Sequence, residues 1–116
     1  MIEKEIQKQI TDYLTSEGVK WTKTVTNTKS GDPDLICCWR GKYFALEVKV
    51  PGKMPTPLQA RKLKEIHIAG GIAMYATSVV SVAACMEQIK LGNFSYPLLV
   101  QNWIEQFEAK QESLEL

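Results

Sequence analysis

Three charged residues of types that can do chemistry interrupt two apolar segments. Asp34 follows a proline and opens the run DLICCW, while Glu47 and Lys49 lie two apart near the end of the run KYFALEVKV. Residues two apart on a β-strand share one face of a sheet. Burying a carboxylate or an ammonium group without a partner is costly, so we expect these charges to be paired with one another or with something bound.

A divalent cation accounts for two carboxylates and a lysine in one place. Carboxylates brought close together repel each other, and a hard divalent cation relieves this repulsion by taking their oxygens as ligands. A lysine beside such a site can orient or deprotonate a water, or stabilise the charge that develops on a phosphate. Asp34, Glu47 and Lys49 together therefore suit the hydrolysis of a phosphodiester.

A simpler interpretation competes with this one. A Glu-x-Lys sequence in a strand is commonly an exposed ion pair of little energetic value, and Pro33-Asp34 alone is commonly only a turn. Their joint occurrence favours the chemical interpretation, because 12 residues separate Asp34 from Glu47 and the hairpin signal Arg40-Gly41 lies between them.

The elements that must position these residues follow from the hydrophobic patterning. Apolar residues at every fourth position predict an N-terminal helix, and apolar β-prone runs between turn signals predict strands. The expected helices are 2–16, 57–69, 78–91 and 97–112, and the expected strands are 19–26, 34–39, 42–50 and 72–76. This αβββαβαα order, with an antiparallel hairpin and then a parallel crossover, predicts one α/β domain over residues 1–116 with a mixed β-sheet flanked by helices.

The stretch from Gly31 to Gly71 resembles the PD-(D/E)XK nuclease superfamily, and within it the small stand-alone VRR-NUC nucleases of phages and bacteria. Pro33-Asp34 and Glu47-Val48-Lys49 match the two catalytic segments of the superfamily. Gln59 matches the glutamine that this group places at the head of the next helix, and Gly70-Gly71 matches the turn after it. The resemblance covers about residues 2–82 and implies a restriction-endonuclease-like core.

What the resemblance implies is a metal-dependent endonuclease that hydrolyses DNA. Mg²⁺ or Mn²⁺ would be held by Asp34, Glu47 and the main-chain carbonyl of Val48, and Lys49 would position the attacking water. Gln59 would contact the water or the scissile phosphate. The resemblance also implies a homodimer that cuts branched DNA such as four-way (Holliday) junctions.

Two assignments stay open at this point. Thr56-x-x-Gln59 is also a capping box, so Gln59 has a structural role that can replace or accompany a catalytic one. The superfamily also tends to use an acid from the first helix, and at about 100° per residue Glu3 lies roughly 50° from the centre of the apolar stripe and Glu5 roughly 110° from it. We therefore prefer Glu3, while both acids are also simply favourable in the first turn of a helix.

Polar and basic residues near the motifs are candidates for contacts with DNA phosphates. Each basic residue alone is better explained as a solvated surface charge, and the serine is equally well explained as part of a plain loop. The candidates are Ser30, Lys23, Lys29, Lys53, Arg61 and Lys62.

The charge is distributed unevenly along the chain. The net charge is only +1, but residues 1–64 carry a balance of +5 and residues 65–116 a balance of −4, which indicates a basic working face in the first part. No apolar run approaches the roughly 20 residues of a membrane span, and three cysteines without metal-ligand spacing predict reduced thiols. We expect a cytoplasmic protein, bacterial or in a phage-infected host, without a membrane partner.

Two other classes of function compete with a nuclease. A non-catalytic nucleic-acid-binding module or nuclease-fold subunit usually loses a carboxylate or the lysine, whereas Asp34, Glu47 and Lys49 are all present here. A structural domain with a metal-free ion-pair network would show no effect of divalent metals on its stability.

Overall fold

The first helix forms where apolar residues recur at every fourth position. In the computed structural model, which describes residues 1–25 and 31–92, α1 spans Glu3–Ser16 and buries Ile6, Ile10 and Leu14 completely or almost so. Gly18, with a φ of 79°, lets the chain leave the helix and turn towards the sheet. The first predicted helix is therefore confirmed.

The predicted hairpin is present with the predicted turn. Strands β2 (Leu35–Trp39) and β3 (Lys42–Val48) pair antiparallel, with Trp39 opposite Lys42. The two residues between them, Arg40 and Gly41, have φ values of 51° and 79°, as a two-residue turn with positive φ at both positions requires. This turn fixes the register that places the start of β2 next to the end of β3.

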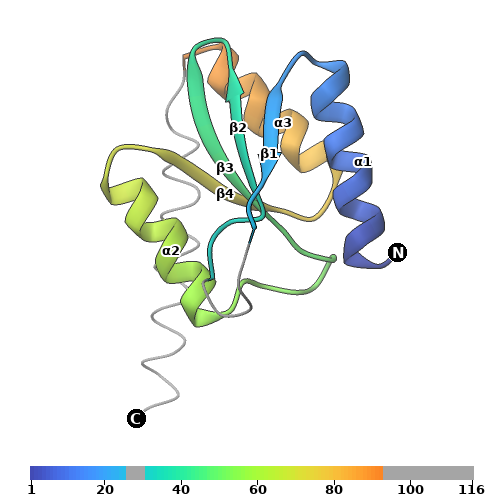
Figure 1. The fold of residues 1–116 in the computed structure, drawn as a ribbon, viewed down its shortest axis with the longest axis vertical. Coiled ribbons are helices and arrows are strands. Elements are labelled where there is room, and N and C mark those ends of the chain that lie inside the picture. Colours follow the sequence, from blue (N-terminus) through green and yellow to red (C-terminus); the bar gives the residue numbers. More distant parts are fainter. Residues whose placement is uncertain (26–30, 93–116) are drawn as a thin grey trace.

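A parallel crossover follows the hairpin. The helix α2 (Pro57–Ile68) connects β3 to β4 (Ile72–Ala76), which pairs parallel to β3, and β1 (Lys20–Lys23) pairs antiparallel to β2. The strand order within the described residues is thus β1-β2-β3-β4, with β1 at one edge. The predicted mixed sheet flanked by helices is confirmed (Figure 1).

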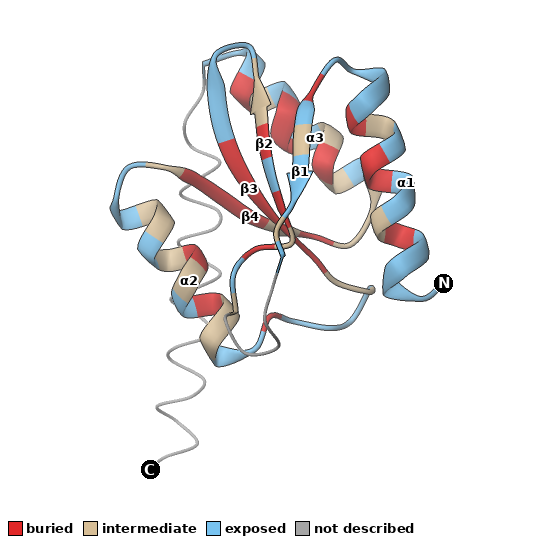
Figure 2. Cartoon of the chain, viewed as in Figure 1, coloured by how far each residue is buried: buried red, intermediate tan, exposed pale blue. Residues whose placement is uncertain are grey.

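Helices lie on both faces of the sheet. The indole Nε1 of Trp21 donates to Thr15 of α1 at 2.9 Å, so α1 lies on the face of β1 that Trp21 occupies. α3 (Val79–Lys90) packs beside α1, whereas α2 lies on the other side of the sheet, next to β4 (Figure 1). Buried residues are concentrated in β3 and β4 and on the inner sides of the helices (Figure 2).

Three of the strands are shorter than the sequence predicts, whereas β4 has the predicted range. Within the described residues, the strand expected over 19–26 forms only over Lys20–Lys23, and Thr24, which follows it, donates its N–H to the Asp34 carbonyl at 3.0 Å and its hydroxyl to the Pro33 carbonyl at 2.7 Å. β3 ends at Val48 rather than residue 50, and β2 begins one residue after Asp34. The helix expected over 97–112 lies outside the described residues.

None of the helices in the described part of the chain is both long enough and apolar enough to span a bilayer.

Candidate metal and phosphodiester site

Asp34 and Glu47 meet at the end of the β2–β3 hairpin. Leu35 pairs with Leu46, so the next step along the antiparallel ladder places Asp34 opposite Glu47 with both side chains on one face. The Asp34 carboxylate oxygen Oδ2 accepts the backbone N–H of Val48 at 2.8 Å. This hydrogen bond fixes the Asp34 carboxylate beside the Glu47 side chain.

Glu47 is a buried acid that the surrounding protein satisfies only in part. Its side chain is 1% exposed, and within the described residues its oxygen Oε2 is buried without a hydrogen-bond partner. Burial raises the pKa of Glu47 to about 9, and a hydrogen bond with Asp34 and the charge of Asp34 add to this increase. Acids whose pKa is shifted strongly by burial and a neighbouring charge are typical of functional sites.

Two further predicted residues act on Glu47 electrostatically. The charge of Lys49 lowers the pKa of Glu47, whereas the charge of Glu3 raises it. Both therefore lie within electrostatic range of Glu47. Glu5 does not appear among the causes, and its carboxylate instead accepts the backbone N–H of Ile2 at 3.4 Å. The geometry thus brings Glu3 rather than Glu5 towards the candidate site.

The donor set fits a divalent cation. Asp34 and Glu47 offer adjacent carboxylates on one face, and the unpartnered Oε2 of Glu47 is a buried acceptor that a cation would satisfy. The described residues contain no group of three or more His, Cys, Asp or Glu side chains that could hold a metal. A cation there would therefore depend on the two carboxylates, backbone oxygen and water, and Glu3 would act from a greater distance.

Gln59 occupies the capping position that its sequence context allows. The N–H of Gln59 donates to the hydroxyl of Thr56 at 3.2 Å, and its side-chain oxygen Oε1 accepts the backbone N–H of Thr56 at 2.9 Å. The capping box is therefore formed. Because the amide oxygen already accepts the Thr56 N–H, the Nε2 group is the part of Gln59 that is available to donate to a water or a phosphate.

The head of α2 is held against the turn that precedes Asp34. Gly31, with a φ of 64°, lies so close to Leu58 that a Cβ atom on Gly31 would be 2.6 Å from the Leu58 Cγ. Lys62 and Asp32 form an ion pair at 3.9 Å one helical turn further along. These contacts place Gln59 and Asp34 on adjoining segments. The sequence did not predict the role of Leu58, because only tertiary packing brings it to Gly31.

The structure describes four of the six predicted phosphate contacts, and they come from β1, the loop before α2 and α2 itself. Ser30 and Lys29 lie outside the described residues. Lys62 is engaged by Asp32, whereas Lys53 and Arg61 are exposed on the loop before α2 and on α2 itself. Lys23 is exposed at the end of β1, where it pairs with Leu35, the residue after Asp34.

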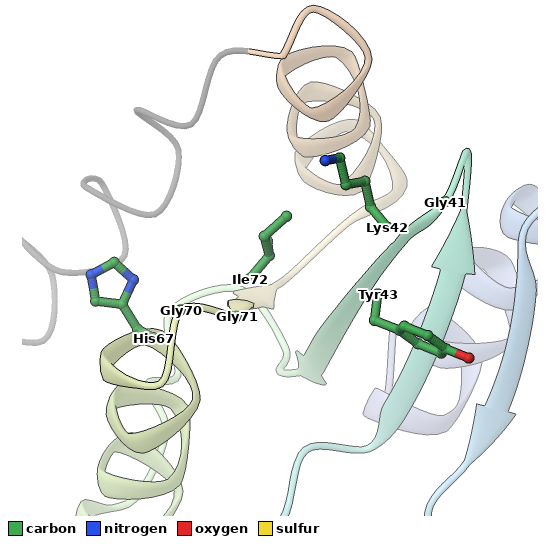
Figure 3. A pocket seen from close by; sticks show the side chains of 7 residues that line it. All are labelled: Gly41, Lys42, Tyr43, His67, Gly70, Gly71 and Ile72. Carbon is green, nitrogen blue, oxygen red and sulfur yellow. The ribbon is translucent and has the colours of Figure 1, made fainter.

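A separate pocket of about 570 Å³ lies at the opposite ends of β3 and β4. Lys42, Tyr43, His67 and Ile72 line it together with glycines of the adjoining turns (Figure 3). The His67 and Tyr43 side chains point away from each other, and no carboxylate lines the pocket. This pocket is therefore not a candidate for the hydrolytic chemistry.

Taken together, the four-stranded mixed sheet and three flanking helices form an α/β fold of the restriction-endonuclease type. The sequence matches no protein-family model and no curated protein. Among solved structures it is similar to a "VRR_NUC domain" with a TM-score of 0.65 and 26% identity, over 73% of this chain and 94% of that one. A "VRR_NUC domain protein" is similar with a TM-score of 0.63 and 22% identity, over 83% of this chain and 94% of that one.

These likenesses support assignment of the chain to the VRR-NUC family, and the family resemblance predicted from the sequence is confirmed. The matched regions contain about three quarters of the chain or more, and almost the whole of each neighbour. The fold thus supplies a nuclease-domain framework for Asp34, Glu47 and Lys49.

Proposed function

We propose that the chain is a metal-dependent endonuclease that hydrolyses phosphodiester bonds in DNA. The observation that carries the proposal is the pairing of Asp34 with a Glu47 side chain that is buried, carries an unpartnered oxygen and has a strongly raised pKa. A structural ion pair would leave no buried carboxylate oxygen unsatisfied. The likeness to structures named for a VRR_NUC domain supports the same activity.

Each residue of the candidate site has a distinct proposed role. Asp34, Glu47 and the Val48 carbonyl would hold Mg²⁺ or Mn²⁺, which when bound supplies a lowered pKa for a water and charge to offset that of the phosphate. Lys49, whose charge acts on Glu47, would orient the attacking water. The Nε2 group of Gln59 would donate to that water or to a phosphate oxygen, and Glu3 would bias the charge of the site from α1.

The substrate that we propose is branched DNA, such as a four-way junction, cut by a homodimer. Ile36 and Tyr43 support a dimer, because they are 38% and 72% exposed on the same sheet face as Glu47. Exposed apolar side chains on a sheet are suited to burial against another copy. Light scattering of the full chain measures this directly, and a monomeric mass at micromolar concentration would contradict the dimer.

Cleavage of three labelled DNA substrates tests the activity. A four-way junction, a flap and a linear duplex are incubated with Mg²⁺ or Mn²⁺ and the full chain, and with the Lys49→Ala variant. We expect cleavage by the wild type, greatest for the junction, and about 100-fold less by Lys49→Ala, in line with the loss of a general acid–base group. Lys90→Ala is the matched control, because Lys90 is exposed at the end of α3 and is not among the candidate DNA contacts.

The assay also separates the rival functions. If none of the substrates is cut but the junction is bound, the chain is a non-catalytic binding module. If Lys49→Ala and the wild type cut equally, the hydrolysis belongs to a contaminant or to another site. Equal cutting of junction and duplex would leave the nuclease and overturn the selectivity for branched DNA.

A further inference from the structure

A groove runs between α1 and the edge strand β1. It encloses about 560 Å³, within the range of roughly 300–1,000 Å³ that is usual for ligand sites. Residues of α1 that recur at three- and four-residue spacing form one wall, and Trp21 and Lys23 of β1 form the other. The groove is therefore a feature of two regular elements rather than of a loop.

The groove lies at the same end of the sheet as the candidate site but on the opposite face, because Trp21 and Lys23 alternate with the face that carries Asp34 and Glu47. Lys23 pairs with Leu35, the residue that follows Asp34, and the first turn of α1 carries Glu3, whose charge acts on Glu47. From Ile2 to Asp12, the two ends of the lining on α1, the helix rises about 15 Å. A nucleic-acid strand that extended from the candidate site around the edge of β1 at Lys23 would therefore reach this groove.

The charge of the groove favours a polyanion. Three lysines line it, Lys4, Lys8 and Lys23. Its two acids are engaged within α1, because Glu5 accepts the backbone N–H of Ile2 at 3.4 Å and Asp12 pairs with Lys8 at 2.9 Å. Within residues 1–25 and 31–92 neither Lys4 nor Lys23 has an acidic partner, so both ammonium groups are available to phosphates. Because Glu5 keeps its charge, the three lysines and two acids of the lining sum to a net charge of +1.

Trp21 adds an aromatic surface to these charges. Its side chain is half-buried, and the bond from Nε1 to the Thr15 hydroxyl holds the ring in one orientation. The N–H of Thr24 donates to the Asp34 carbonyl, so Thr24 belongs to the hydrogen-bonded pairs of this antiparallel ladder. The alternate residues, Trp21 and Lys23, therefore direct their backbone N–H groups to the outer edge, where the described residues place no further strand.

We propose that this α1–β1 groove binds single-stranded nucleic acid, with Lys4 and Lys23 on phosphates and Trp21 stacked against a base. A basic track with an aromatic platform is the arrangement that binds single strands without reading their sequence. The inference rests on the proposed nuclease function, because its role there is to hold one strand next to the bond that is cut. Cations and a ring favour this occupant over an extended peptide added to the edge of β1.

Binding of a labelled oligothymidylate of about 12 nucleotides to the full chain in EDTA tests the groove. The double variant Lys4→Gln/Lys23→Gln is compared with Lys20→Gln/Lys90→Gln, which removes the same charge elsewhere. Lys20 lies on the same strand but on the opposite face from Trp21, and Lys90 ends α3. We expect the groove variant to bind about tenfold more weakly, with a salt dependence smaller by about 1.4 in log–log slope, and the control to bind like the wild type.

Trp21 is tested by Trp21→Leu and Trp21→Phe. Stacking predicts about tenfold weaker binding for Trp21→Leu and recovery of most of the affinity for Trp21→Phe. Circular dichroism of both variants identifies any loss of folding, and a fall in affinity that only tracks unfolding overturns the role of the ring.

Three results would show that the groove does not bind single-stranded nucleic acid. No binding of the oligonucleotide, equal binding by the groove and control variants, or displacement of the oligonucleotide only by an extended peptide would overturn the groove proposal. Cleavage is measured in parallel, so failure of the nuclease proposal shows as oligonucleotide binding through the groove without cutting. Failure of the groove proposal shows as cutting that the groove variants leave unchanged.

Discussion

Asp34 stands opposite Glu47 across the hairpin, and its Oδ2 atom accepts the Val48 N–H at 2.8 Å, next to a Glu47 oxygen that is buried without a partner. Two acids this close cannot both ionise without a neighbouring positive charge, so the pair either retains a proton or is balanced by a cation. Metal binding, pH and changes in the packing of α2 should therefore each alter the stability or the cleavage activity of the protein measurably.

The first prediction concerns metal binding without any substrate. Mn²⁺ should raise the thermal midpoint of the wild type relative to EDTA, because a ligand at 100 times its Kd adds about 2.7 kcal/mol to the free energy of unfolding. Asp34→Asn should abolish most of this shift, since it removes one of the two carboxylates. Differential scanning calorimetry measures both.

A surface carboxylate provides the control for metal binding. Asp12 is exposed and paired with Lys8, so Asp12→Asn should keep the full Mn²⁺ shift. An equal shift in the wild type and in Asp34→Asn would favour a metal-free role for the pair, as in a structural ion-pair network.

The second prediction concerns pH in EDTA. The pKa of Glu47 is raised from an ordinary 4.5 to about 9, chiefly by burial, so the folded state holds this proton more tightly than the unfolded state does. The contribution of Glu47 to stability is then complete below about pH 4.5 and is lost as the pH rises towards 9. The loss should be on the order of a few kcal/mol and should show in urea unfolding at a series of pH values.

Glu47→Gln separates this effect from other titrations. The amide keeps the shape without the charge, so the variant should lose the decline in this window and be more stable than the wild type at pH 8 in EDTA. With Mn²⁺ present, the difference in stability between the variant and the wild type should shrink or change sign, because only the wild type binds the cation. Parallel pH profiles for the two proteins would show that Glu47 is not the buried acid responsible.

Much of this arrangement is predictable because its signals are local. Arg40-Gly41 specifies the hairpin turn, and that turn sets the register that brings Asp34 to Glu47. The short form of β1 could not be predicted, because it accompanies a contact between the Thr24 hydroxyl and the Pro33 carbonyl, nine residues away in the chain. The preference for Glu3 over Glu5 came from helix geometry, whereas the approach of Glu3 to Glu47 depends on how α1 packs on the sheet.

The third prediction concerns the contact between Gly31 and α2. Gly31→Ala places a Cβ atom 2.6 Å from the Leu58 Cγ at a φ of 64°, so it combines backbone strain with overpacking. The matched control is Gly18→Ala, at a φ of 79° with no atom within 4 Å of the added Cβ. We expect a loss of about 1 kcal/mol for Gly18→Ala and about 2–4 kcal/mol for Gly31→Ala in urea unfolding.

A double variant identifies the crowding at Gly31. The loss of stability in Gly31→Ala/Leu58→Ala should be smaller than the sum of the losses in the two single variants. The reason is that Leu58→Ala removes the Cγ atom that the Cβ of Gly31→Ala would meet. Strict additivity would show that Gly31 is needed only for its backbone conformation.

The last prediction decides what Gln59 does. Thr56→Val removes the hydroxyl that accepts the Gln59 N–H and should cost about 1 kcal/mol of stability, while the Thr56 backbone N–H can still hold the Gln59 side chain. Gln59→Ala removes the side chain from the cap and from the candidate site. If the Nε2 group contacts the water or the phosphate, Gln59→Ala should reduce cleavage of the preferred substrate about tenfold or more, and Thr56→Val should reduce it little.

Stability and rate together separate the two roles. A cap alone predicts that both variants lose similar stability and retain wild-type cleavage at a temperature where both are folded. A catalytic contact predicts that Gln59→Glu, which preserves an acceptor for the Thr56 N–H but loses the donor, cleaves as poorly as Gln59→Ala. Because the amide oxygen accepts the Thr56 N–H in the helix cap, the Nε2 donor is the group of Gln59 that can contact a phosphate oxygen, and wild-type cleavage by Gln59→Glu would assign this residue to the cap.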